Sequence, residues 1–149
     1  MTIMSKSVAN RPLPAPARVG MHLSEVDTPA LLLDLDAFER NLDRLDASLA
    51  GRSVRLRPHA KSHKTPQLAL RQIARGAVGV CCQKVSEAEA MVAGGVHDVL
   101  IANEVVGSGK LARLAALAKR AAIGVCVDDL GNLGELEATA RKAGSRPDV

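Results

Sequence analysis

Two histidines and two lysines lie within eight residues, Arg57-Pro58-His59-Ala60-Lys61-Ser62-His63-Lys64, at the point where an apolar, strand-like run ends. Polar groups that converge at the end of a strand form the active sites of many α/β proteins. A lysine held neutral in a confined pocket can attack a carbonyl group as an amine. The segment therefore points to Schiff-base chemistry at Lys61; a basic loop on a solvated rim is the alternative.

Alternation along the strand that we expect before Lys61 places Arg57, His59 and Lys61 on one face. In a parallel barrel the apolar face packs against helices, so this basic face would look toward the barrel axis and mouth, where a phosphate could bind. The four-residue spacing of His59 and His63 suits a metal only on a helix, and Pro58 makes His59 extended. We expect both histidines to hydrogen-bond or stack on a cofactor; a half-buried structural role is the alternative.

Two later strand-like runs also end in polar residues: Gln83 and Lys84 close one, and Asn103 and Glu104 close the next. Polar residues at the carboxyl ends of parallel strands are site candidates in any α/β fold, although they can equally be ordinary residues at the start of a helix. The stretch 107–110 looks like a phosphate loop but departs from the Walker pattern at two positions. We expect a plain helix N-terminus there, which can still attract an anion.

Strand-like and helix-like segments alternate from residue 28 onward. The expected strands cover residues 29–35, 54–61, 78–85, 98–105 and 123–128, and another begins near Pro147. We expect Asp36, Thr65 and Ser86 to cap the first three intervening helices. This order predicts an α/β fold with a parallel sheet. Spacing alone leaves a doubly wound sheet and a (β/α)8 barrel open, and a barrel of about 250 residues would continue beyond these four to five units.

The composition of the 149-residue chain narrows the function further: 47% of residues are hydrophobic, 24% are charged, only 1% are aromatic and the net charge is +4. The lack of aromatic stacking groups and the dispersed charge argue against nucleic-acid binding. No segment reaches the ~20 apolar residues of a membrane span, and residues 1–27 resemble a flexible leader without a secretory core, so we expect a cytoplasmic protein. Three cysteines in strand-like runs indicate reduced, buried thiols: Cys81, Cys82 and Cys126.

Four segments together resemble the D-threonine aldolase / D-serine dehydratase family, which are pyridoxal-phosphate (PLP) enzymes of the alanine-racemase-like fold. They are Asp27-Thr28-Pro29-Ala30-Leu31, the run from Arg57 to Lys64, Gly79-Val80-Cys81-Cys82-Gln83-Lys84-Val85-Ser86-Glu87-Ala88 and Asp98-Val99-Leu100-Ile101-Ala102-Asn103-Glu104-Val105. The resemblance implies that residues 28–149 are the N-terminal part of a TIM-like (β/α)8 barrel that binds PLP. Residues 54–61 would form its first strand, and residues 29–35 would belong with a later β-rich domain.

The resemblance also implies that Lys61 carries the cofactor. The other candidate cofactor-binding residues are Arg57, His59, His63, Gln83 and Asn103. A divalent metal, manganese or zinc, would be held by residues absent from this chain, and no metal ligand is expected within it.

The activity implied is cleavage of a D-3-hydroxy amino acid, such as D-threonine to glycine and acetaldehyde, in a complete protein that can form a homodimer. The alternatives are a D-serine or 3-hydroxyaspartate dehydratase and a non-catalytic PLP-binding protein. We expect the 149-residue chain alone to be inactive.

Overall fold

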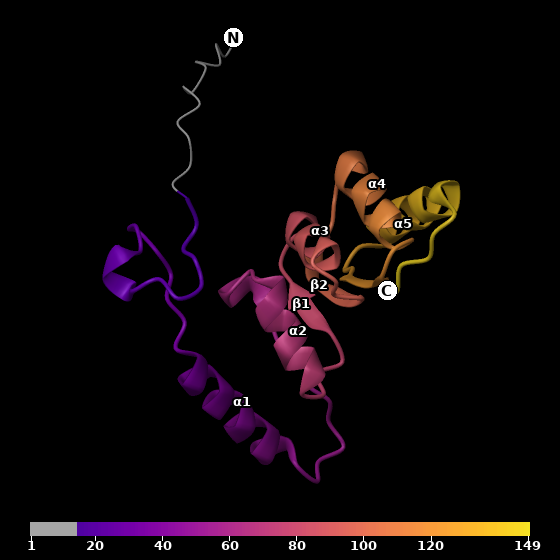
Figure 1. Cartoon of the computed structure of the whole chain (residues 1–149). Coiled ribbons are helices and arrows are strands. Elements are labelled where there is room, and N and C mark those ends of the chain that lie inside the picture. Colours follow the sequence, from indigo (N-terminus) through magenta and orange to yellow (C-terminus); the bar gives the residue numbers. More distant parts are fainter. Residues whose placement is uncertain (1–14) are drawn as a thin grey trace. The chain divides into compact units, whose positions relative to one another are not determined.

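The computed structural model describes residues 15–149, which divide into two compact units, the first ending at Phe38 and the second comprising Glu39–Val149 (Figure 1). The first fourteen residues of the leader expected at 1–27 lie outside the described residues. No helix within residues 15–149 is long and apolar enough to cross a membrane.

The first unit contains one short 3-10 turn, η1, at Leu23–Glu25. The His22 backbone N–H donates to the Glu25 carboxylate at 2.9 Å, and the Ser24 N–H donates to the imidazole of His22, so the turn is closed from both sides. The prediction of a strand at residues 29–35 is wrong. These residues follow a cis Thr28–Pro29 bond, are exposed, and pair with no strand in the described part of the chain.

Helix α1 spans Leu35–Leu49 and so begins in the first unit and ends in the second. Its cap differs from the one expected. The Asp34 carboxylate accepts the Ala37 N–H at 2.8 Å, two residues before the expected Asp36. A cap must lie just outside the first helical turn for its side chain to reach the free N–H groups, and that position belongs to Asp34.

The second unit contains a three-stranded parallel sheet in the order β1-β2-β3, with β1 at Val80–Cys82, β2 at Asp98–Glu104 and β3 at Ala122–Cys126. Chain segments continue the sheet on both edges. Before β1, the extended residues 56–59 pair in parallel with it through the His59–Cys81 bridge. After β3, Asp148 pairs with Gly124. Five parallel segments therefore follow the order expected for part of a (β/α) barrel.

The segment expected as a strand at 54–61 is shorter than expected. Only two backbone hydrogen bonds join it to residues 78–81: Val78 N–H to the Leu56 carbonyl at 3.0 Å and Cys81 N–H to the Pro58 carbonyl at 2.8 Å. Proline has no N–H to donate, which weakens the ladder at this edge. The chain then leaves the sheet at Ala60, so the strict alternation expected through Lys61 ends at His59.

Four helices connect the strands: α2 at Pro66–Ala74, α3 at Val85–Ala93, α4 at Ser108–Leu117 and α5 at Leu130–Ala143. Pro66 occupies the first turn of α2, where its missing N–H costs nothing. Thr65 precedes it as expected, but its side chain makes no cap hydrogen bond. Helix α3 starts two residues earlier than expected, with Lys84 rather than Ser86 at the cap position. Asp129 caps α5 by accepting the Asn132 N–H at 2.7 Å.

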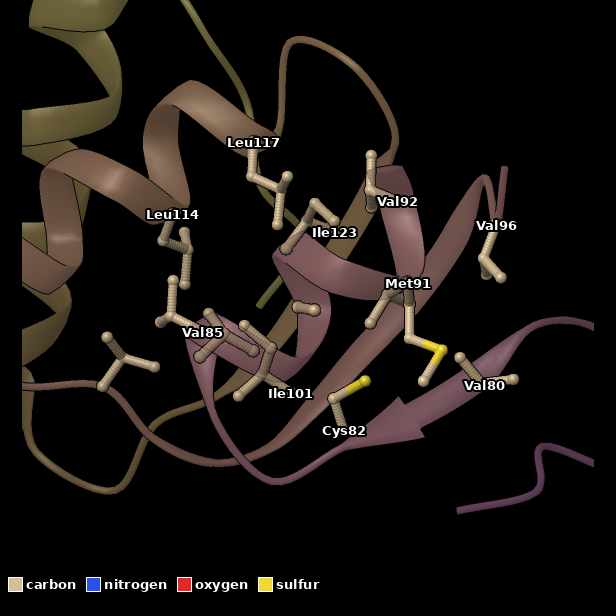
Figure 2. Packing of buried hydrophobic residues seen from close by; sticks show 14 of the residues in the cluster. Val80, Cys82, Val85, Met91, Val92, Val96, Ile101, Leu114, Leu117 and Ile123 are labelled. Atoms are coloured by element: carbon tan, nitrogen blue, oxygen red, sulfur yellow. The ribbon is translucent and has the colours of Figure 1, made fainter. Parts of the chain in front are cut away.

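The helices cover one side of the sheet, and the side chains between them form the core (Figure 2). Inward-facing residues of the strands and apolar residues of α3 and α4 are at most a few per cent exposed; the largest are Met91, Ile101, Leu111, Leu114 and Ile123. Burial of each such side chain contributes roughly 1.5–3 kcal/mol. The other side of the sheet is more open. Cys81 there is half-buried and Cys126 is exposed, which corrects the expectation that all three thiols are buried.

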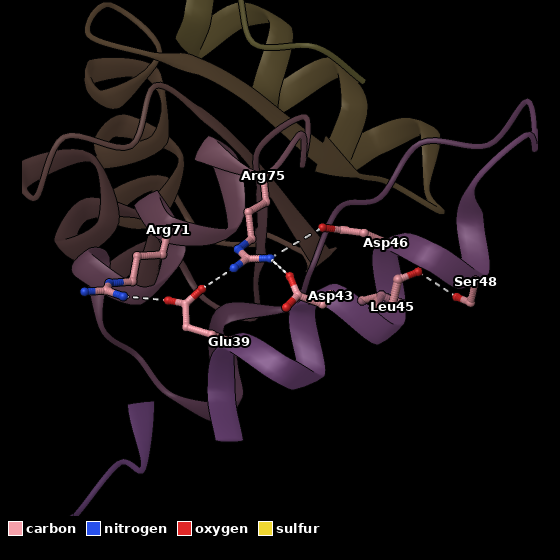
Figure 3. A network of polar contacts seen from close by, with 7 residues as sticks. All are labelled: Glu39, Asp43, Leu45, Asp46, Ser48, Arg71 and Arg75. Atoms are coloured by element: carbon pink, nitrogen blue, oxygen red, sulfur yellow. Dashed lines mark hydrogen bonds and ion pairs between the residues drawn. The ribbon is translucent and has the colours of Figure 1, made fainter. Parts of the chain in front are cut away.

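Within the second unit, α1 meets α2 through charges (Figure 3). The Glu39 carboxylate accepts from Arg71 at 2.6 Å and also pairs with Arg75, which reaches Asp43 as well. The pKa of Glu39 is lowered by the hydrogen bond from Arg71, against the opposing effect of desolvation. This contact is polar and largely exposed, unlike the apolar core under α3 and α4.

Candidate active site at the carboxyl end of the strands

Lys61 lies in a tight 3-10 turn, η2, at Ala60–Ser62, directly after the segment that pairs with β1. Ala60 is 2% exposed and anchors the turn in the core, while Lys61 is exposed. The backbone N–H groups of His63 and Lys64 both donate to the Ala60 carbonyl, at 3.2 and 2.7 Å. The turn therefore presents the Lys61 side chain outward from a fixed backbone.

The amine of Lys61 has no salt-bridge partner among the residues that the structure describes, where eight ion pairs bind other cations. An amine without a carboxylate partner can approach a carbonyl carbon without an ion pair being broken first. The position and the chemistry of Lys61 thus fit an aldehyde cofactor.

His59 precedes the turn and fixes it. Its Nδ1 accepts the Lys61 backbone N–H at 3.3 Å, and its backbone carbonyl accepts the Ser62 hydroxyl at 3.2 Å. Because Nδ1 acts as an acceptor, the neutral imidazole carries its proton on Nε2. The half-buried ring of His59 can therefore offer an Nε2–H donor next to Lys61.

His63 follows the turn but faces another way. Its Nδ1 accepts the Thr65 N–H at 3.0 Å, and its Nε2 is buried without a hydrogen-bond partner, as is Oε1 of Gln72 on α2. Burial lowers the pKa of His63, and the nearby Gln72 side chain opposes this effect only in part. The structure therefore places His63 between the turn and α2, in the half-buried role that was the alternative to cofactor contact.

Gln83 and Asn103 meet at the carboxyl ends of β1 and β2. Both line a cavity of about 250 Å³, together with the charged residues Lys84, Glu104, Lys110 and Arg113. Amide groups and an excess of positive charge beside the strand ends suit a polar or anionic ligand. The structure thus brings Gln83 and Asn103 together, as expected from the order of the strands.

Arg57 is not part of this group. Its Nη1 donates to the Asp98 carboxylate at 2.8 Å, and Asp98 is the first residue of β2. The guanidinium therefore lies at the amino end of the sheet, opposite the end at which Gln83 and Asn103 meet. Arg57 lies on the predicted face of the strand, but its long side chain extends toward the amino end of the sheet rather than toward the carboxyl end.

Glu87 was missed by sequence reasoning. Its carboxylate accepts the Gln83 backbone N–H at 2.9 Å through Oε2 and lies 3.4 Å from the Lys64 ammonium through Oε1. The signal for it was its place three residues after Lys84, where a helix-start glutamate often reaches back to the preceding backbone. Sequence reasoning assigned Ser86 as the cap instead and so overlooked the contact.

The buried Cys82 thiol and the acidic residues provide no second kind of chemistry in the described range. Burial raises the pKa of the Cys82 thiol to about 12, so this thiol stays protonated and inert near neutral pH. No group of three or more His, Cys, Asp or Glu side chains within residues 15–149 could hold a metal ion.

A parallel β/α order, with an available lysine in the turn after its first parallel segment, defines a barrel-type α/β domain with a candidate carbonyl-binding amine. Residues 33–149 match the alanine racemase N-terminal domain family. The chain belongs to this family and forms part of a (β/α) barrel.

Relatives with known activities agree with this assignment. The chain is 53% identical to a D-threonine aldolase of an Arthrobacter species over 137 residues, which is 92% of this chain and 36% of that protein. It is 48% identical over 132 residues to a 3-hydroxy-D-aspartate aldolase of Paracoccus denitrificans, covering 87% of this chain and 34% of the relative.

A solved structure confirms the fold. The crystal structure of D-threonine aldolase from Filomicrobium marinum superimposes with a TM-score of 0.87 at 60% identity, over 92% of this chain and 37% of that one. The chain thus spans about a third of the length of the proteins that it resembles.

Proposed function

We propose that this chain supplies the lysine-bearing part of a PLP-dependent enzyme that cleaves D-3-hydroxy amino acids between Cα and Cβ. The observation that carries the proposal is Lys61, whose exposed amine projects from a fixed turn at the end of the first parallel segment. Two aldolases of D-3-hydroxy amino acids among the relatives support the reaction. Bound PLP supplies an electron sink for negative charge that develops at Cα.

Each residue of the candidate site has a distinct part in this proposal. Lys61 holds the cofactor through its amine. His59 orients the turn through Nδ1 and offers a donor through Nε2. Gln83 and Asn103 present their side chains where the cofactor or the substrate would lie, at the carboxyl ends of β1 and β2. We leave Arg57 and His63 out of this set, because Arg57 is engaged by Asp98 and His63 turns toward α2.

A divalent metal, manganese or zinc, is part of the proposal for the complete protein only. The described residues contain no group that fits a metal, so we derive no step through one. The small-molecule D-amino acid substrate, a homodimer and a cytoplasmic location likewise stay predictions for the complete protein.

Product analysis tests the reaction. The complete protein that contains this chain would be supplied with PLP, a divalent metal and either D-threonine or 3-hydroxy-D-aspartate. Glycine together with an aldehyde is the expected result. Ammonia together with a 2-oxo acid would replace the aldolase by a dehydratase, while bound PLP with neither product would favour a non-catalytic PLP-binding protein.

Replacement of Lys61 tests the residue assignment. In the complete protein, Lys61→Ala and Lys61→Arg should both abolish cofactor attachment that can be trapped by borohydride and located by peptide mapping. Activity should fall roughly 10³-fold or more, as happens when a covalent nucleophile is removed. Lys61→Arg keeps the positive charge but not the nucleophilic amine, so it separates the two roles.

The exposed Lys119 provides a matched control, and Lys119→Ala should leave both properties unchanged. Cofactor trapped on another lysine in the Lys61 variants would contradict the assignment. Because Lys61 is exposed, its loss should not lower the thermal stability of the protein.

A further inference from the structure

Glu87 is a carboxylate with two partners from different parts of the chain. It is the third residue of α3, its side chain is 14% exposed, and it accepts the Gln83 backbone N–H at 2.9 Å. Its second oxygen lies 3.4 Å from the Lys64 ammonium. Burial opposes its ionisation, but the Gln83 hydrogen bond and the Lys64 charge outweigh burial and lower its pKa. The group is therefore ionised at neutral pH and holds both partners.

Lys64 lies at the end of the loop that carries Lys61 and has an uncommon backbone conformation. Its φ is +50°, the only positive φ of a residue other than glycine within residues 15–149. Side chains with a Cβ disfavour this region, so neighbouring contacts must hold the residue there. Two contacts do so: the Lys64 N–H donates to the Ala60 carbonyl at 2.7 Å, and its ammonium pairs with Glu87.

The Lys61 turn is thus held at both ends by the same strand and its following loop. On one side, His59 pairs with Cys81 of β1. On the other, Lys64 pairs with Glu87, whose carboxylate accepts the backbone N–H of Gln83, one residue beyond the end of β1. A side chain that must meet a cofactor with its reacting atom in place depends on such support.

We propose that Glu87 is a positioning residue for Lys61, because its carboxylate ties the loop of Lys61 to the end of β1. The inference rests on the proposed function, and it adds a role for Glu87 and Lys64 in holding the amine in place. Glu87 acts through Lys64 and the Gln83 backbone and does not itself touch the reacting atoms.

Cofactor binding by the complete protein tests this role without measuring turnover. The variants are Glu87→Gln, which keeps an oxygen acceptor for the Gln83 N–H but removes the charge, and Lys64→Met. The readouts are the dissociation constant of PLP, the fraction trapped on Lys61 by borohydride, and the pH midpoint of the absorbance of the lysine-bound cofactor. Glu89→Gln is the matched control, since Glu89 lies on the same helix and pairs with Arg113 instead.

We expect PLP to bind on the order of tenfold more weakly to Glu87→Gln, less than the hundredfold that a full 1 Å misplacement can cost. Lys64→Met should act in the same direction, and the double variant should lose little more than either single variant, as partners in one contact do. Both should shift the pH midpoint of the absorbance, which a merely structural effect would leave unchanged. Lys64→Arg should restore the binding, and Glu89→Gln should match the unaltered protein.

Two outcomes would overturn the inference, and they are distinguishable. If the unaltered protein carries the cofactor on Lys61 but Glu87→Gln and Lys64→Met match Glu89→Gln in affinity and pH midpoint, Glu87 has no positioning role and the proposed function stands. If the unaltered protein forms no trapped product on Lys61, the proposed function fails and the inference fails with it. The Lys64 side chain is 66% exposed, so Lys64→Met should fold even where Glu87→Gln does not.

Discussion

At the amino end of the parallel strands, charged groups are paired and packed closely, whereas at the carboxyl end Lys61 is exposed and without an ionic partner. Arg57 donates to Asp98 at 2.8 Å at the amino end, beside Gly79. At the carboxyl end, the Lys61 side chain is exposed, and Gln83 and Asn103 line a cavity of about 250 Å³. One short run of sequence supplies both ends, because Arg57 and Lys61 are only four residues apart.

This difference between the two ends indicates that the amino end of the sheet contributes mainly to stability and the carboxyl end mainly to ligand binding. Contacts at the amino end join distant parts of the chain and so support the fold, as is usual for this face of a barrel. At the carboxyl end, the Glu87–Lys64 ion pair and the His59 ring hold the turn, and the Lys61 side chain stays free for a ligand. Changes at the amino end should therefore lower stability first, and changes at the carboxyl end should affect ligand binding first.

Gly79→Ala should have the largest effect on stability. A Cβ at this position would overlap the Asp98 carbonyl oxygen and the Arg57 guanidinium, and the backbone φ of +153° also disfavours it. Overpacking together with backbone strain should lower the free energy of unfolding by about 3 kcal/mol, measured by urea unfolding.

Gly134→Ala is the matched control for this change. Gly134 lies within α5, and an added Cβ there would meet no atom within 4 Å. Alanine in the middle of a helix is favoured over glycine, so this variant should gain up to about 1 kcal/mol. Equal stability of the two variants would contradict the close packing at the amino end.

Arg57→Gln should have a smaller effect. The pair with Asp98 is partly exposed, at 26% and 43% of the two side chains, so solvent screens it. We expect a loss of about 0.5–1 kcal/mol in unfolding free energy and no change in PLP affinity. Arg55→Gln, at an exposed position without an ion pair among the described residues, should change neither property. A large loss of PLP affinity in Arg57→Gln alone would show that Arg57 belongs to the cofactor site. It would contradict the division of roles between the two ends of the sheet.

The pH dependence of stability near the Lys61 turn should be the smallest of the three effects. Burial lowers the pKa of His63 below its usual value of 6.5, so the unfolded chain binds a proton at a pH where the folded chain does not. Stability from this group is fully present above pH 6.5 and is lost as the pH falls from 6.5 through the lowered pKa. Thermal unfolding measured between pH 7.5 and 5.5 should show this decrease.

His63→Asn should reduce the slope in this range, since asparagine can still accept the Thr65 N–H but does not titrate. An unchanged slope would mean that His63 is protonated equally in the folded and unfolded states. In that case its ring would be solvated rather than buried against α2.

Sequence reasoning located much of the carboxyl end but less of the amino end. The lysine turn and the strand ends at Gln83 and Asn103 follow from the point at which an apolar run stops. The pairing of Arg57 with Asp98 joins residues 41 positions apart, and no local pattern predicts which acidic group a long side chain will reach. The absent strand at 29–35 shows the same limit, because a strand forms only where a partner lies alongside.

The sequence by itself determined the alternation of strands and helices, the apolar faces that build the core, and the place of Lys61 after the first parallel segment. These features depend on periodicity and on where it ends, which are properties of neighbouring residues. The tertiary structure alone decided that His63 turns toward α2, that Asp34 and Lys84 occupy the cap positions, and that Glu87 reaches Lys64. At each of these positions a side chain could make several contacts of similar strength. Which contact forms is decided only when distant backbone segments lie side by side in the folded chain.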